Sequence, residues 1–208
     1  MNYVFYTIYK EENLLKKSFN FFAFLSRMKH ITRWGLMRNT STENIQEHSL
    51  QVAMIAHSLA IISNTYFGSN INAERVAVLA IYHDSNEAII GDLPTPIKYY
   101  NPDIEMAYKD LEDISKNKLL SMLPPNMVPE YRNILFYDES SYEGRLVKAA
   151  DRISAYIKCL EEEKAGNEEF KKAAEATLKK IHEMKMPEID YFFQHFIQGF
   201  SLTLDELN

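Results

Sequence analysis

The stretch NAERVAVLAIYHDSNEAIIG, residues 72–91, decides the fold of this chain, because it sets a polar pair inside a strongly apolar helical pattern. Its apolar and functional side chains recur at steps of three and four residues, the spacing of one helix face. Asn72 can cap a helix and Gly91 can end it. We therefore predict one helix over 72–90 that carries the pair His83 and Asp84 near its end.

Helical patterns also fill most of the remaining chain. The run 44–63 is apolar on nearly every side and opens with a capping-box pair, Asn44 and Glu47, so we expect it at the centre of a bundle. The two prolines of Asp92-Leu93-Pro94-Thr95-Pro96 predict an extended loop directly after the first helix. Further helices are expected over 103–122, 129–137, 143–164, 168–184 (solvated) and from 187 onward. The predicted fold is an all-α, single-domain bundle of about seven or eight helices.

The composition excludes several classes of function. With 208 residues, 46% of them hydrophobic and 25% charged, and with only 6 Gly and 7 Pro, the chain is too apolar for disorder and poor in turns for an all-β fold. A net charge of -6 argues against binding a nucleic-acid polymer or an anionic membrane. The single Cys159 lies in a helical pattern, where a buried inert thiol is expected. No stretch of about 18 apolar residues occurs, so we expect a soluble cytoplasmic protein.

Four potential metal ligands, His48, His83, Asp84 and Asp151, lie on three of the expected helices. Adjacent side chains on a helix point about 100° apart, so His83 and Asp84 can share one ion only with help from other helices. His48 and Asp151 can give that help, and a carboxylate beside the apolar stripe of 143–164 needs a partner or a metal. Two nitrogen and two oxygen donors suit one divalent ion of the Mn, Co, Fe or Mg class better than a closed tetrahedral zinc site. The pattern indicates a metal-dependent hydrolase.

This H…HD…D pattern and its surroundings resemble the HD-domain phosphohydrolase superfamily and, within it, the bacterial 5'-deoxynucleotidases. The resemblance runs from about residue 21 to residue 206, and RW, EHS, YHD, GDLPTP and the AD pair of 150–151 occur in the family's order. It implies an all-helical, usually dimeric enzyme that removes the 5'-phosphate from deoxyribonucleoside monophosphates. The metal ligands implied by the resemblance are His48, His83, Asp84 and Asp151.

The resemblance also implies roles for the neighbours of the metal. Arg33 would orient the phosphate, and Trp34 would lie against the deoxyribose, where its ring leaves no room for a ribose hydroxyl. Glu87 or Asp92 would act as acid, base or water positioner. The implied catalytic residues are Glu87, Asp92 and Arg33, and the implied substrate-binding residues are Arg33, Trp34, His48, Asp84, Asp92, Leu93, Pro94, Thr95 and Asp151.

Two alternatives remain at this level. One is another HD phosphohydrolase that cleaves a cyclic nucleotide, a nucleoside triphosphate or an alarmone, and the other is a catalytically silent HD domain that serves as a nucleotide-binding scaffold. His57 in the central helix is expected to be a core histidine, with support for a second ion as the alternative reading. Residues 1–18 form an N-terminal extension outside the resemblance, and 19–208 form the phosphohydrolase domain.

Overall fold

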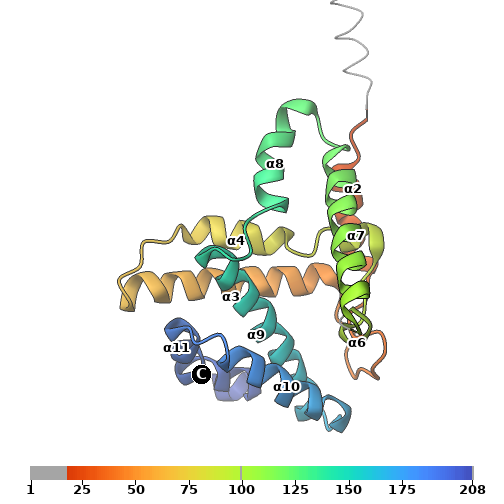
Figure 1. The fold of residues 1–208 in the computed structure, drawn as a ribbon. Coiled ribbons are helices and arrows are strands. Elements are labelled where there is room, and N and C mark those ends of the chain that lie inside the picture. The colour runs from red at the N-terminus through yellow and green to blue at the C-terminus, as the bar shows by residue number, and fades with distance from the viewer. Residues whose placement is uncertain (1–17, 99, 208) are drawn as a thin grey trace, which may run out of the picture.

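The computed structural model describes residues 18–98 and 100–207, and within them the all-α prediction is confirmed. In this described part the extended backbone pairing amounts to one isolated antiparallel bridge, between Thr32 and Asn44. The helices, shown in Figure 1, are α2 Phe21–Leu25, η1 Ser26–His30, α3 Ile45–Tyr66, α4 Ala73–Tyr82, α5 Glu87–Ile90, α6 Thr95–Lys98, α7 Pro102–Leu120, η2 Pro125–Met127, α8 Val128–Leu135, α9 Tyr142–Lys164, η3 Glu168–Phe170, α10 Lys171–His182, α11 Pro187–His195, η4 Ile197–Ser201 and η5 Leu204–Leu207. None of these helices is both long and apolar enough to cross a membrane. The predicted extension over 1–18 falls, except for Ser18, outside the described residues.

Helix α3 lies at the centre of the bundle, as its sequence predicts. Asn44 caps it by accepting a hydrogen bond from Glu47 N at 3.0 Å, and the Glu47 side chain accepts one from Asn44 N at 3.4 Å. Helix α3 packs most extensively against α4 and α9, and Figure 1 shows α3 and α4 running along each other through the middle of the molecule. The main apolar core fills the space between α3, α4, α9 and α11. A second apolar cluster joins α2, α7 and α8.

The prediction of one continuous helix over 72–90 was wrong. Helix α4 ends at Tyr82, and α5 begins only at Glu87. Between them the backbone makes bonds three residues apart, such as Ser85 N to Tyr82 O at 3.1 Å and Glu87 N to Asp84 O at 3.0 Å. Such turns are tighter than an α-helix and change the direction of successive side chains. The break therefore falls on the HD pair, and Gly91, with φ 77°, ends α5 as expected.

Three further expectations need correction. The segment 92–96 is extended only to Pro94, because α6 begins at Thr95 and a proline in a first helical turn loses no hydrogen bond. The region 168–184 is amphipathic and not simply solvated, since Phe170 and Ile181 are fully buried. His57 is exposed on α3 and is not a core histidine.

Candidate functional site

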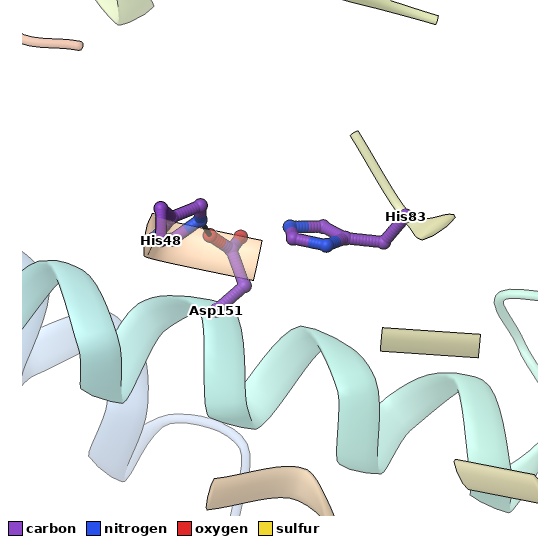
Figure 2. Close-up of side chains that lie close together, drawn as sticks. All are labelled: His48, His83 and Asp151. Carbon is purple, nitrogen blue, oxygen red and sulfur yellow. Dashed lines mark ion pairs between the residues drawn. The ribbon is translucent and has the colours of Figure 1, made fainter. Parts of the chain in front are cut away.

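The four expected metal ligands come together from three elements. His48 lies in the first turn of α3, His83 caps the end of α4 with Asp84 after it, and Asp151 lies on α9. His48 Nε2 is 3.3 Å from Asp151 Oδ1 and 3.6 Å from Asp84 Oδ2, and His83 Nε2 is 3.1 Å from Asp84 Oδ2. Figure 2 shows the two imidazoles and the Asp151 carboxylate pointing toward one another. The ligand atoms of His48, His83 and Asp151 all lie within 4.8 Å of one another.

The chemistry of this cluster fits a divalent cation. The Nε2 atoms of His48 and His83 are buried and face carboxylate oxygens, but none of these contacts has the geometry of a hydrogen bond, although polar groups in a protein interior are rarely left so. The side chains of Asp84 and Asp151 are 25% and 21% exposed, so the cluster opens toward solvent on its carboxylate side. The imidazole nitrogens of His48 and His83 and the Asp151 carboxylate face one another, with the Asp84 carboxylate 3.6 and 3.1 Å from the two imidazoles, and this is a donor set for one ion with open positions.

Contacts at the opposite ring nitrogens orient both histidines. His83 Nδ1 lies 2.7 Å from the carbonyl oxygen of Ala80, which accepts its hydrogen and leaves Nε2 free to bind a metal. His48 Nδ1 lies 3.1 Å from Ser154 Oγ, and Ser154 donates to Gln51 Oε1 at 2.5 Å. Sequence reasoning did not find Ser154 or Gln51, although their spacings from Asp151 and His48, of three residues each, place them on the same helix faces.

Glu87 and Asp92 lie close to this cluster as titratable neighbours. Glu87 is 7% exposed, and its Oε2 has no hydrogen-bond partner. Burial, together with the negative charges of Asp84 and Asp92, raises the pKa of Glu87 to about 10. Burial also raises the pKa of Asp92, against the opposing charges of Arg33 and Lys98. The surroundings of Glu87, one turn beyond the HD pair, therefore favour its neutral, protonated form.

Arg33 and Trp34 lie on the loop that precedes α3. Arg33 Nη1 contacts His48 Nδ1 at 2.5 Å and Glu43 Oε2 at 2.9 Å. Although burial opposes its charge, the carboxylates of Glu43, Asp151 and Asp84 raise the pKa of Arg33. Trp34 packs against Phe170, with ring centroids 5.2 Å apart, and is partly exposed. The structure thus places Arg33 in contact with an expected metal ligand and Trp34 beside it.

A cavity of about 430 Å³ reaches the carboxylate side of the cluster. His83, Asp84 and Asp151 line one end of it, and residues of α7 and α9 form much of the remaining wall. This volume lies in the range of small-molecule sites, which is roughly 300–1,000 Å³. Several expected site residues are not part of its wall as described: Arg33, Trp34, Glu87, Asp92, Leu93, Pro94 and Thr95.

The loop Asp92-Leu93-Pro94 leads from α5 to α6 and keeps its residues partly buried, whereas Thr95 is exposed. Lys98 at the end of α6 donates to Glu112 Oε1 on α7 at 2.8 Å, and its ammonium lies 4.4 Å from the ring centre of Tyr108. The tethered α6 fixes the path of this loop beside Glu87. None of these contacts was visible in the sequence, because the partners are far apart in the chain.

Comparison with known proteins decides the family. A family model described as 5'-deoxynucleotidase YfbR-like matches residues 20–200. This chain belongs to that family. It is 53% identical over 192 residues to a 5'-deoxynucleotidase of Photorhabdus laumondii, covering 91% of this chain and 96% of the relative. It is 54% identical over 190 residues to a 5'-deoxynucleotidase of Vibrio vulnificus, covering 91% and 98%.

Solved structures support the fold of this YfbR-like chain. An HD-domain phosphohydrolase of Listeria innocua matches with a TM-score of 0.77 at 24% identity, covering 87% of this chain and 88% of that one. The cyanophage S-2L HD phosphohydrolase, bound to dA and one catalytic Zn²⁺ ion, matches with a TM-score of 0.61 at 19% identity, covering 85% and 96%. The HD-domain fold expected from the motif is therefore confirmed.

Proposed function

We propose that this chain is a metal-dependent 5'-deoxynucleotidase, which hydrolyses deoxyribonucleoside 5'-monophosphates to deoxynucleoside and phosphate. The observation that carries the proposal is the convergence of the buried Nε2 atoms of His48 and His83 with the carboxylates of Asp84 and Asp151, in a chain of the YfbR-like family. His48, His83, Asp84 and Asp151 would hold one divalent ion of the Co, Mn, Fe or Mg class. The substrate class is supported by relatives that are named 5'-deoxynucleotidases and align along 91% of the chain.

Each neighbouring residue receives a role from its own chemistry. The divalent ion, when bound, supplies Lewis acidity toward a phosphate oxygen and a water molecule. Arg33 binds the phosphate and neutralises its charge, because a guanidinium matches two phosphate oxygens at once. Trp34 covers the apolar face of the deoxyribose. A hydroxyl at C2' would be desolvated there without a partner, which costs about 1–3 kcal/mol.

Proton transfer is assigned to Glu87 and Asp92. Burial and the nearby carboxylates raise the pKa of Glu87 to about 10, and this favours it as the acid that protonates the leaving 5'-oxygen. Asp92 lies on the loop that follows and orients the attacking water. Substrate contacts from His48, Asp84, Asp151, Leu93, Pro94 and Thr95 complete the proposed site.

A homodimer in the cytoplasm is the proposed setting, with residues 1–18 as an extension to the domain 19–208. Its support on the surface is an exposed apolar stripe of α3, formed by Leu50, Met54 and Ile61, which are 59%, 60% and 44% exposed. Large apolar side chains that stay exposed along one helix are typical of protein interfaces. Light scattering of the purified protein measures the subunit number, and a monomer would refute this assignment.

The proposed function is tested on protein stripped of metal and reconstituted separately with Co²⁺, Mn²⁺, Fe²⁺ or Mg²⁺. Phosphate release is measured with dAMP, AMP, dATP and cyclic AMP as substrates. The proposal expects hydrolysis of dAMP well above AMP, with the metal-free protein inactive. A preference for dATP or cyclic AMP would identify another HD phosphohydrolase, and binding of dAMP without turnover by every metal form would identify a silent nucleotide-binding domain.

A further inference from the structure

Glu43 is a largely buried carboxylate that connects the two residues proposed to contact the substrate. Its Oε2 atom accepts hydrogen bonds from Arg33 Nη1 at 2.9 Å and from Trp34 Nε1 at 3.0 Å. The side chains of Arg33 and Glu43 are each only 13% exposed, so this ion pair is largely shielded from water. One oxygen atom thus fixes both the guanidinium and the indole, and charge-assisted bonds of this kind are among the stronger ones in proteins.

The backbone brings Glu43 to this position by a short antiparallel pairing. Arg33 N donates to Glu43 O at 2.9 Å, and Ile45 N donates to Ile31 O at 3.0 Å. Because the pairing places residue 33 opposite residue 43, their side chains meet without any further adjustment of the loop. The register of this pairing therefore decides which carboxylate faces the guanidinium.

Trp34 needs such an anchor because its backbone is strained. Its φ is 61°, in the left-handed region that a bulky side chain rarely adopts. Such conformations persist only where the surroundings hold them, and they gather at functional sites. Trp34 O accepts from Met37 N at 2.9 Å, its ring rests on Phe170, and Glu43 holds its Nε1. Glu43 accepts the hydrogen bond of the indole N–H.

The base of this loop is fixed to α9 by a second buried carboxylate. Glu162 is fully buried and accepts hydrogen bonds from Thr40 N at 2.8 Å and Ser41 N at 3.2 Å. Lys158 pairs with Glu162 and donates to Ser41 O at 2.7 Å. Glu43 follows two residues after this clamp, so its backbone is held while its side chain binds Arg33 and Trp34.

We propose that Glu43 is a positioning residue, which couples the phosphate contact of Arg33 to the sugar contact of Trp34 so that both depend on one carboxylate. The proposal rests on the roles given above to Arg33 and Trp34. Loss of Glu43 should weaken phosphate binding and discrimination between deoxyribose and ribose together. The metal ligands and Glu87 stay in place, so the chemical step should change much less than substrate binding.

The first measurement follows Trp34 directly and needs no substrate. Trp34 is the only tryptophan of the chain, so intrinsic fluorescence reports this ring alone. In Glu43→Gln the amide oxygen can accept only part of the original contacts, and in Glu43→Ala none remain. We expect acrylamide quenching to increase and fluorescence anisotropy to fall in the order wild type, Glu43→Gln, Glu43→Ala.

The second measurement is steady-state kinetics with dAMP and AMP on the same proteins, after metal content has been shown to equal that of wild type. Losing one charge-assisted contact should raise KM for dAMP roughly tenfold or more, with a smaller change in kcat. The ratio of kcat/KM for dAMP over AMP should fall toward that of Trp34→Ala. In a Trp34→Phe background, which has no indole N–H, Glu43→Gln should reduce the ratio less, because coupled residues are not additive.

Glu169→Gln is the matched control, because Glu169 also pairs with an arginine of this loop, Arg38 at 3.2 Å, but on the surface. It should leave fluorescence and the sugar ratio unchanged. Unchanged fluorescence in Glu43→Gln and Glu43→Ala overturns the proposal, as does an unchanged sugar ratio in these variants while Trp34→Ala lowers it. If Trp34→Ala itself leaves the ratio unchanged, the sugar role of Trp34 fails, and the coupling that rests on it is refuted with it.

Discussion

Replacing Glu162 by alanine should destabilise the protein strongly, because this carboxylate is the centre of a buried polar network. Its exposed fraction is 0%, and that of Lys158 is 3%. Glu162 Oε2 accepts from Thr40 N at 2.8 Å, Thr40 Oγ at 2.7 Å and Asn167 Nδ2 at 2.9 Å, while Oε1 pairs with the Lys158 ammonium. The variant would leave a buried ammonium without its counter-charge and several donors without their acceptor.

Breaking a buried ion pair by removing one partner costs about 3–5 kcal/mol, chiefly because the remaining charge is uncompensated. For a domain of this size each kcal/mol lowers Tm by roughly 2–4 °C, so Glu162→Ala should lower Tm by about 6–20 °C. Removing both charges in Lys158→Met/Glu162→Leu should cost less than the single change, because no unpaired ion is then buried.

The assay is urea unfolding followed by circular dichroism at a fixed metal concentration, since a bound ion adds to apparent stability. Glu163→Ala, the exposed neighbour on α9, is the control and should change stability by less than about 0.5 kcal/mol. A loss below about 1 kcal/mol in Glu162→Ala, or a double variant less stable than the single one, would refute the reasoning.

The same network predicts a dependence on pH. Although burial opposes it, hydrogen bonds from Lys158, Asn167 and Thr40 lower the pKa of Glu162 below its ordinary value. A lowered pKa in the folded state gives stability that is present above the unfolded pKa, about 4.3, and is lost as pH falls toward the folded pKa. The difference in unfolding free energy between wild type and Glu162→Ala should therefore be constant near neutral pH and shrink below about pH 4.

Three further predictions concern other buried groups. Glu87→Gln keeps the shape of a neutral carboxyl, so metal content and affinity for dAMP should persist while kcat falls roughly 10²-fold or more; an unchanged kcat would make Glu87 structural. Asp84→Ala and Asp151→Ala should lose bound metal and activity together, and full metal occupancy by elemental analysis would exclude them as ligands. Cys159, whose pKa burial raises to about 12, should resist iodoacetamide at pH 8 in the folded protein and react after unfolding, whereas rapid native labelling would contradict its burial.

The sequence alone determined the features that depend on near neighbours. The cap of α3 at Asn44, its buried stripe and the end of α5 at Gly91 follow from hydrogen bonds and side-chain spacing within a few residues. Composition and helical periodicity predicted the all-α fold, and the H…HD…D motif with its surrounding segments resembled the family to which the chain belongs. His48 and Asp151 were recognisable because polar side chains beside apolar stripes need a partner.

Tertiary structure decided the features that depend on contacts far apart in the chain. The predicted helix of 72–90 breaks at 83–86, and the break lets both His83 and Asp84 lie in the cluster with His48 and Asp151. Local helix propensity does not predict this break, because the contacts that accompany it are distant in the chain. The sequence around His57 is as apolar as that around His48, so the sequence does not distinguish the two histidines. Helices α4 and α9 pack against α3, and His57 lies on its exposed side. Glu43 reads in the sequence as a residue before a helix cap, and it becomes the anchor of Arg33 and Trp34 only when an antiparallel pairing ten residues apart brings them together. The sequence does not predict which cation a carboxylate will pair with. The free energy of such an ion pair depends on burial and geometry, which the whole fold determines.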